Sequence, residues 1–272
     1  MLPLEQTQLD AEGYDRGPDK LYRVGTCNTH GVRRKTDVLI GLGSGTYHVQ
    51  ETAATPHVEE EVGKALRRAG KSVCFGHKVE PRASSSRIWG HLTGVMSWSD
   101  LPMRRSKEPL PSGLDGKRYL CTWQQPTPWQ AVRHINIYGY PSSDAQGGAY
   151  AAKAATEQLL WEAFVVGSSG PDVPTLICAD LNQDVDQSEV FAYFATRGWV
   201  DVAQAHAHRT GTACEMTCRH ATRRDIIFAN ASAFSRFRCA STRHGLFPDH
   251  SLFVADFLWP SEKVERQIWV MP

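Results

Sequence analysis

Long apolar stretches are absent from the sequence, and so is any strong excess of charge. No run approaches the roughly 18 consecutive apolar residues of a membrane-spanning helix, and residues 1–20 are polar, without the apolar core of a secretory signal. We therefore expect an intracellular protein, nuclear or cytoplasmic and not secreted, whose seven cysteines are free thiols. The formal net charge is only +1, so any binding to nucleic acid must come from a local basic face.

Internal repeats and low-complexity linkers are also missing. Hydrophobic residues make up 41% of the 272 residues and charged residues 22%, proportions that are typical of a globular protein with a sizeable core. Nothing between residues 21 and 260 resembles a hinge. We therefore expect a disordered leader over residues 1–20, one domain over residues 21–260 and a C-terminal tail over residues 261–272.

Strand-like runs outnumber helical patterns, and the helical patterns stand singly between groups of strands. This arrangement favours the α+β class, with two packed sheets flanked by helices, over a doubly wound parallel sheet. Three helices are expected. One begins at Pro56 and is stopped by Gly70, and the other two cover Ala149–Val166 and Ser188–Thr196. The expected strands are Leu21–Cys27, Tyr47–Gln50, Ser72–Phe75, Ser86–His91, Gly94–Trp98, Tyr119–Gln124, Val132–Tyr138, Pro174–Cys178, Asp225–Ala229, Phe237–Ser241 and Ser251–Phe257, with loops at Leu101–Lys117 and Pro126–Trp129.

Acids, amides and one histidine gather at the ends of these strands, where a rigid sheet can direct polar groups into one cleft. A carboxylate such as Glu51 suits a hard divalent cation. Asp180 and Asn182 stand two residues apart, so on an extended segment both would face one side and could hold an attacking water. A histidine held by a second carboxylate supplies charge to a phosphate oxygen. This set predicts metal-assisted hydrolysis of a phosphoester.

Five short segments carry these residues, in the order Cys27-Asn28-Thr29-His30-Gly31, Gln50-Glu51-Thr52, Ile177-Cys178-Ala179-Asp180-Leu181-Asn182, Arg223-Arg224-Asp225-Ile226-Ile227-Phe228 and Pro248-Asp249-His250-Ser251. They resemble the N-x-x-G, Q-E-T, G-D-x-N, R-x-D-Y-I and S-D-H motifs of the endonuclease/exonuclease/phosphatase superfamily. That superfamily contains the apurinic endonucleases, the deoxyribonuclease I group and the endonuclease domains of non-LTR retrotransposons. The resemblance spans about residues 21–259 and implies a four-layer α/β/β/α sandwich with two mostly antiparallel sheets.

The resemblance also implies a metal site. Glu51 would be the main ligand of Mg²⁺, with Mn²⁺ as the alternative cation. Asn28 would lie beside it, and Asp249 would lie close to the metal.

Catalytic roles follow from the same resemblance. Asp180, helped by Asn182, would orient or deprotonate the attacking water. His250 would contact the scissile phosphate, with Asp225 fixing the tautomer of its ring. A tyrosine at the end of the strand over residues 132–138 would touch the same phosphate; Tyr138 and Tyr140 both qualify, and we favour Tyr138.

Three positions depart from the pattern of the superfamily. His30 stands where many of its nucleases have an acid, Ala179 replaces a glycine, and Pro248 replaces a serine. The loss of the acid would weaken a second metal position or alter the metal preference.

Two further groups of residues were weighed for binding roles. Arg104, Arg105 and Lys107 fall in an expected loop between groups of strands, where we expect them to contact a substrate backbone. The segment from Cys214 to His220 could hold zinc, but it lacks a clear second ligand pair, and a loop with free thiols is favoured. The remaining histidines carry no motif and are expected at the surface or in loops.

The function predicted from the sequence is that of a metal-dependent DNA endonuclease of the retroelement type. The segment Tyr138-Gly139-Tyr140-Pro141 and the end of the chain just past the last expected strand favour that subgroup. Two alternatives stay open: a phosphatase or phosphodiesterase acting on a small phosphoester or on RNA, and a catalytically silent module that binds nucleic acid.

Overall fold

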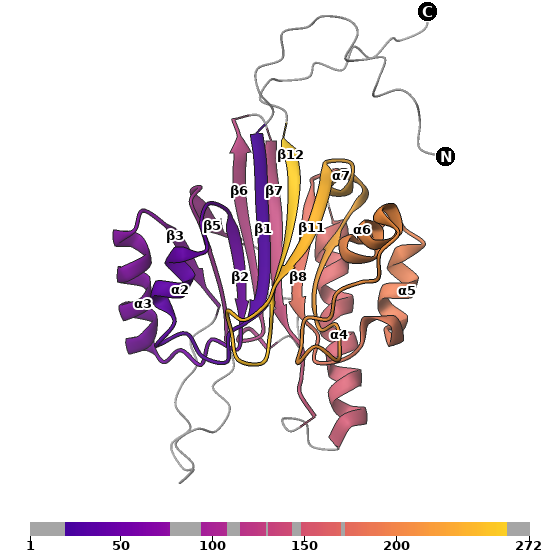
Figure 1. The fold of residues 1–272 in the computed structure, drawn as a ribbon, viewed down its shortest axis with the longest axis horizontal. Coiled ribbons are helices and arrows are strands. Elements are labelled where there is room, and N and C mark those ends of the chain that lie inside the picture. Colours follow the sequence, from indigo (N-terminus) through magenta and orange to yellow (C-terminus); the bar gives the residue numbers. More distant parts are fainter. Residues whose placement is uncertain are drawn as a thin grey trace, which may run out of the picture.

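Two six-stranded sheets pack face to face in the computed structural model, which describes residues 20–76, 94–107, 115–128, 130–142, 148–169 and 172–259 (Figure 1). The first sheet has the strand order β11 (Phe237–Arg243), β12 (Leu252–Trp259), β1 (Lys20–Asn28), β2 (Thr46–Gln50), β4 (Val95–Ser99) and β3 (Ser72–Phe75). The second has the order β5 (Met103–Arg105), β6 (Tyr119–Thr127), β7 (Gln130–Tyr138), β8 (Thr175–Asp180), β10 (Asp225–Ala229) and β9 (Val200–Asp201). Each sheet contains one parallel pair, β1 with β2 and β7 with β8, and its other pairs are antiparallel.

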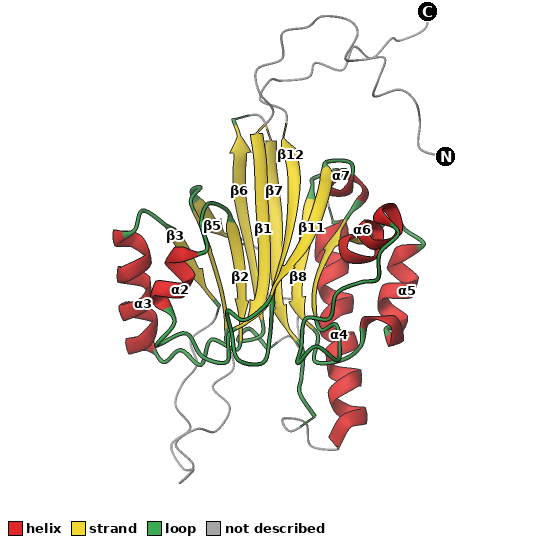
Figure 2. Cartoon of the chain, in the orientation of Figure 1, coloured by secondary structure: helices red, strands yellow, loops and turns green. Residues whose placement is uncertain are grey.

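Helices cover the outer faces of both sheets (Figure 2). The described helices are α2 (Thr36–Gly41), α3 (Pro56–Arg68), α4 (Gly148–Ser168), α5 (Glu189–Ala195), α6 (Val202–Thr210) and α7 (Ala231–Phe234), of which α6 and α7 pack against the layer between the sheets. Helices α2 and α3 pack on the first sheet, and α4 and α5 on the second. The α+β sandwich expected from the sequence is confirmed.

Helix α3 illustrates why the sequence folds locally as it does. The Oγ1 atom of Thr55 accepts a hydrogen bond from the backbone N–H of Val58, and Pro56 occupies the first turn, where its missing N–H is not needed. After the helix, Gly70 adopts φ +76°, the left-handed conformation that lets the chain turn back into β3. Val62 and Leu66 on the inner face are fully buried against the first sheet.

Alternation along the strands divides the core into layers. On β8, Ile177 and Ala179 pack against α4 and α5, whereas Leu176 and Cys178 enter the layer between the two sheets. Since side chains on a strand alternate between its faces, Asp180 at the end of β8 shares the side of Leu176 and Cys178. The layer between the sheets therefore runs directly into the ends of the strands.

Part of this layer is polar, which the sequence analysis did not predict. His48 on β2 and His134 on β7 are fully buried and stacked, with ring centroids 5.0 Å apart. The Nε2 atom of Gln50 donates to Oδ1 of Asn136 across the sheets, at 2.7 Å. The expectation that histidines without a motif lie at the surface is wrong for His48 and His134.

Several local expectations also differ from the structure. Residues 103–105, expected within a loop, form the edge strand β5, which pairs with β6. The elements α2, β9, α6 and α7 were not anticipated, and β6 continues to Thr127 through the start of the expected turn. The expected strand Ser86–His91, Trp129, residues 1–19 of the leader and the tail over residues 261–272 lie outside the described residues. Over the part of the chain that is described, no helix combines the length and apolarity needed to cross a membrane.

Candidate active site

Five strand ends meet at one edge of the layer between the sheets. Tyr138 at the end of β7 pairs with Asp180 at the end of β8, and Asp180 pairs in turn with Asp225 at the start of β10. On the first sheet, Asn28 ends β1 beside Gln50, the last residue of β2. All five side chains are nearly or fully buried, although four of them are polar or acidic and the fifth is a phenol.

Asn28 joins the two sheets. Its Nδ2 atom donates to Oε2 of Glu51 at 2.8 Å and to Oδ2 of Asp180 at 2.7 Å, and its backbone N–H donates to Oδ1 of Asp225 at 3.0 Å. One residue therefore fixes three carboxylates that would otherwise repel one another, two through its side-chain amide and one through its backbone N–H. In this arrangement the amide nitrogen of Asn28, and not its oxygen, faces the acids.

Glu51 follows β2 in a left-handed backbone conformation, with φ +51°. Its Oε2 atom also accepts a hydrogen bond from the hydroxyl of Tyr138 at 3.2 Å. Burial, together with the negative charges of Asp180 and Glu51, raises the pKa of Tyr138 well above its ordinary value, so the phenol stays protonated and can donate. Of the two candidate tyrosines, Tyr138 is thus the one that reaches the acids. Tyr140 packs on the guanidinium of Arg118, 4.2 Å from its ring.

Asp225 and His250 form a buried pair, with Nδ1 of His250 lying 2.7 Å from Oδ2 of Asp225. Burial lowers the pKa of His250, but the hydrogen bond and charge of Asp225 outweigh it, with help from Asp180, and raise that pKa to about 9. The ring therefore carries a proton at neutral pH. Burial and the charge of Asp225 raise the pKa of Asp180 to about 6, so Asp180 is mostly ionised at neutral pH.

Asn182 is placed differently from the sequence expectation. It lies beyond β8 with φ +53°, a conformation that asparagine tolerates, so strand alternation does not align it with Asp180. Instead its backbone N–H donates to Oδ1 of Asp180 at 3.0 Å, and its Nδ2 atom donates to the carbonyl of Gly139 at 3.1 Å. Asn182 thus holds the carboxylate of Asp180 and joins the end of β8 to the end of β7.

Comparison with known proteins rests on structure alone. No family profile matches the chain, and no curated protein matches its sequence. Among solved structures, an AP endonuclease from Archaeoglobus fulgidus has a TM-score of 0.65 at 15% identity, covering 87% of this chain and 99% of that one. The 3' phosphatase NExo from Neisseria, bound to a product DNA hairpin, has a TM-score of 0.63 at 14% identity, covering 88% and 100%. An endonuclease/exonuclease/phosphatase family protein from Bacteroides thetaiotaomicron has a TM-score of 0.59 at 13% identity, covering 90% and 100%.

This chain shares the fold of these three proteins. The likeness of sheets and helices extends over almost the whole of each of these proteins. At these identities the likeness concerns the fold, so the chemistry of this chain has to be argued from its own side chains.

The donor set suits a divalent cation. One ligand atom each from Asp180, Asp225 and His250 lies within 4.8 Å of the others, and Glu51 is linked to this group through Asn28. Three carboxylates outweigh the single imidazolium, so the site carries unbalanced negative charge. Carboxylate oxygens are the ligands that hard divalent cations prefer, and the residues present therefore fit the cation that this fold implies.

Other candidate residues lie at the rim or farther away. The carboxylate of Asp249 pairs with Arg219 at 3.1 Å, is partly exposed and is not in the group formed by Asp180, Asp225 and His250. Arg105 pairs with Thr122, four residues along β6 from the level of Tyr138, which is about 14 Å along the strand. Arg104, Arg105 and Lys107 are exposed and do not join the acids.

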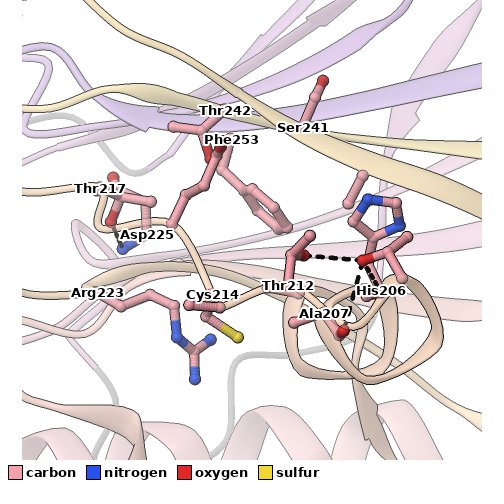
Figure 3. A pocket seen from close by; sticks show the side chains of 15 residues that line it. His206, Ala207, Thr212, Cys214, Thr217, Arg223, Asp225, Ser241, Thr242 and Phe253 are labelled. Atoms are coloured by element: carbon pink, nitrogen blue, oxygen red, sulfur yellow. Dashed lines mark hydrogen bonds between the residues drawn. The ribbon is translucent and has the colours of Figure 1, made fainter.

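A pocket of about 270 Å³ borders Asp225, between α6, the segment over residues 212–217 and β11. Figure 3 places Asp225 and Thr217 at one end of it and His206 at the other, with Cys214 between them. All seven cysteines are free thiols, as expected. Within the described residues, the group of side chains that could hold a metal ion is Asp180, Asp225 and His250. Cys214 and Cys218 do not belong to it.

Sequence reasoning missed two residues that shape the site. The Oγ1 atom of Thr217 accepts hydrogen bonds from the backbone N–H groups of Arg224 and Asp225, at 3.0 and 2.9 Å, and so fixes the start of β10. At Gly139 a Cβ atom would collide with the backbone carbonyl of Leu181. Only the glycine in the Tyr138-Gly139-Tyr140 segment could have served as a signal, because the contact that requires it comes from a segment 42 residues away in the sequence.

Proposed function

We propose that the protein is a divalent-metal-dependent hydrolase that cuts phosphodiester bonds in nucleic acid, and that it acts on DNA as an endonuclease. The observation that carries the proposal is the meeting of Glu51, Asp180 and the Asp225–His250 pair at one edge of the two sheets. The fold is shared with an AP endonuclease and with a 3' phosphatase bound to a DNA hairpin, and both observations support a phosphoester substrate.

His250 is the proposed donor to the phosphate. Its Nδ1 atom is held by Asp225, which leaves Nε2 for the substrate. Because its pKa is raised to about 9, the ring is protonated at neutral pH and places positive charge where negative charge develops in the transition state. Asp225 acts as a positioning residue.

Asp180 is the proposed partner of the attacking water. Its pKa of about 6 leaves it mostly ionised at neutral pH but closer to neutrality than an ordinary aspartate, which suits a group that accepts a proton. Asn182 and Asn28 each bind one of its oxygens and so fix the direction of the carboxylate.

Glu51 is the proposed main metal ligand, with Asn28 and Tyr138 orienting its carboxylate. Mg²⁺ is the expected cation and Mn²⁺ the alternative. A divalent cation bound here neutralises phosphate charge and stabilises the leaving oxygen. Asp249, which now pairs with Arg219, is the proposed outer ligand.

Arg104, Arg105 and Lys107 are proposed to contact the backbone of a long substrate. They are exposed on and after the edge strand β5 of the second sheet. A DNA strand carries a phosphate about every 3.4 Å and extends over many nucleotides, so contacts about 14 Å from the acids are within the reach of a long substrate. A DNA substrate would fit a nuclear location within the intracellular placement expected from the sequence.

The narrower assignment to a retroelement-type endonuclease rests on the segment Tyr138-Gly139-Tyr140-Pro141. Gly139 is required there by its contact with Leu181, a local packing reason that does not depend on the subgroup. The observation that supports the phosphatase as the second candidate is the fold shared with the Neisseria 3' phosphatase.

The test is nicking of supercoiled plasmid in Mg²⁺, in Mn²⁺ and in EDTA, alongside hydrolysis of p-nitrophenyl phosphate and its bis-ester. We expect metal-dependent nicking that is lost in Glu51→Gln and retained in Glu61→Gln, a matched change on the exposed face of α3. Hydrolysis of the small esters without nicking would replace the endonuclease by the phosphatase alternative. Inactivity on every substrate, with plasmid binding intact, would leave the silent binding module.

A further inference from the structure

The two carboxylate oxygens of Glu51 have different surroundings. Oε2 already accepts hydrogen bonds from Asn28, at 2.8 Å, and from Tyr138, at 3.2 Å. Oε1 faces the imidazole of His30, whose Nδ1 atom lies 3.1 Å away. Since two protein donors occupy Oε2, a cation that binds Glu51 approaches through Oε1, and His30 stands beside that approach.

The position of His30 is fixed by its backbone. The residue has φ +51°, and its N–H donates to Oδ1 of Asn28 at 2.8 Å. Its carbonyl accepts from Nζ of Lys35 at 3.2 Å, and the next N–H, of Gly31, donates to the carbonyl of Glu51 at 2.7 Å. The loop that carries the imidazole is therefore tied to the residue that the imidazole faces.

Packing in the protein interior does not explain the position of the His30 imidazole, because this side chain is 66% exposed. The distance between its Nδ1 atom and Oε1 of Glu51 matches that of two ligands on one cation. Ligands at right angles on a metal with bonds of about 2.1 Å lie about 3.0 Å apart. Imidazole nitrogen is a ligand that first-row transition cations accept readily, whereas Mg²⁺ prefers oxygen ligands alone.

We infer that Nδ1 of His30 and Oε1 of Glu51 bind the same divalent cation, and that His30 makes the site select Mn²⁺ and its transition-metal neighbours over Mg²⁺. The inference rests on the proposed metal-dependent function and specifies its cation. Mg²⁺ would still bind through oxygen, but without gain from the imidazole.

The test measures metal binding directly. Mn²⁺ binding to the full chain is titrated by electron paramagnetic resonance, and Mg²⁺ affinity is obtained by competition. Pulsed resonance on the bound Mn²⁺ then reports coupling to a ligand ¹⁴N nucleus. The variants are His30→Asp and His30→Asn, because aspartate and asparagine tolerate a positive φ. His220→Asn is the matched control, since His220 is also exposed and also has a positive φ, of 54°.

We expect ¹⁴N coupling in the unaltered protein and in His220→Asn, and none in His30→Asn. We also expect His30→Asp to lower the preference for Mn²⁺ over Mg²⁺ at least tenfold. Coupling that survives in His30→Asn, or an unchanged preference in His30→Asp, would overturn the inference. If the unaltered protein lacks ¹⁴N coupling while Glu51→Gln still abolishes both Mn²⁺ binding and nicking, the inference fails and the proposed function stands. Absence of both metal binding and metal-dependent nicking would reject both.

Discussion

Two polar clusters lie in the layer between the sheets, and they shift the pKa of histidine in opposite directions. The interior cluster, made of Tyr22, His48 and His134, is fully enclosed; burial lowers the pKa of His48 to about 3 and that of His134 well below its ordinary value. In the strand-end cluster, made of Asn28, Glu51, Asp180, Asp225 and His250, the pKa of the buried His250 is raised to about 9. The difference is the partner, since a carboxylate faces His250 and only neutral groups face the other two rings.

Neutral hydrogen bonds satisfy the interior cluster. The Nδ1 atom of His48 lies 2.8 Å from Oγ of Ser97, and its Nε2 atom lies 3.1 Å from Nδ1 of His134. The Nε2 atom of His134 in turn lies 2.7 Å from the hydroxyl of Tyr22. A closed chain of this kind fixes how the two sheets sit on each other and leaves no charge for chemistry. The strand-end cluster retains charge, and its Glu51 side chain is 27% exposed, so the proposed reaction is placed there.

Removing the carboxylate partner of His250 should have the largest effect on the difference between the two clusters. In Asp225→Asn, burial still disfavours the charged ring and the main compensating charge is gone, so we expect the pKa of His250 to fall from about 9 to below 7. DNA cleavage at pH 7.5 should fall by about 10²-fold or more. NMR titration of the ring and a single-turnover assay measure the two effects, with Asp100→Asn, which alters a pair with Lys71, as control. An unchanged pKa would contradict the role given to Asp225.

The interior cluster should make the fold sensitive to acid. The folded-state pKa of His48 is about 3 and the unfolded value about 6.5, so its contribution to stability is full above pH 6.5 and is lost as the pH falls towards 3. His134 shifts in the same direction. Protonation of His48 should lower the free energy of unfolding by about 1.4 kcal/mol per pH unit in that window, and protonation of His134 should lower it further.

Urea unfolding at pH 7.5 and 5.5 measures this loss. His134→Gln should remove the contribution of about one proton to the pH dependence of the free energy of unfolding. His57→Gln, on the exposed face of α3, should leave that pH dependence unchanged. Equal pH dependence in both variants would mean that the interior rings are not held neutral by the fold.

The phenol of Tyr138 gives a smaller effect, because it adds one hydrogen bond to a carboxylate that Asn28 already holds. Tyr138→Phe should lower the cleavage rate about tenfold, or about 1.4 kcal/mol. Tyr140→Phe is the matched control, since both rings pack on Arg118, at 4.9 and 4.2 Å, and both variants keep that contact. Equal rates in the two variants would remove Tyr138 from the site.

The smallest effect on the chemistry is expected at β5. Replacing Arg104, Arg105 and Lys107 with alanine should leave the cleavage rate of bound DNA unchanged and flatten the dependence of DNA affinity on salt by up to about three counterions. Affinity measured between about 50 and 200 mM salt tests this. An unchanged slope would exclude these residues from the interface.

The sequence predicted the sheet strands well because several of them are short, continuous, mostly apolar runs, as in Thr175–Asp180 and Asp225–Ala229, where every residue is buried. It did not reveal the interior cluster, because His48 and His134 occupy alternate positions that look like a solvated strand face. Strand β5 escaped prediction because it has three residues, two of them exposed arginines.

The acids of the site could be anticipated because each stands at the start or the end of a recognisable strand. Their mutual contacts could not, since the amide of Asn28, which links Glu51 to Asp180, acts between residues far apart in the sequence. The position of Asn182 was misjudged for a related reason. Strand alternation was extended two residues beyond the end of β8, to Asn182, where the chain turns to φ +53°.

Single-turnover cleavage of a labelled DNA duplex by His250→Asn and Glu51→Gln tests most directly whether the strand-end cluster performs the reaction. Melting temperature and duplex affinity are measured on the same samples, with His57→Asn and Glu61→Gln as exposed controls on α3. We expect each site variant to lose at least about 10²-fold in rate while remaining folded and bound to DNA, and each control to cleave normally. Folded site variants that cleave at the unaltered rate would contradict the account.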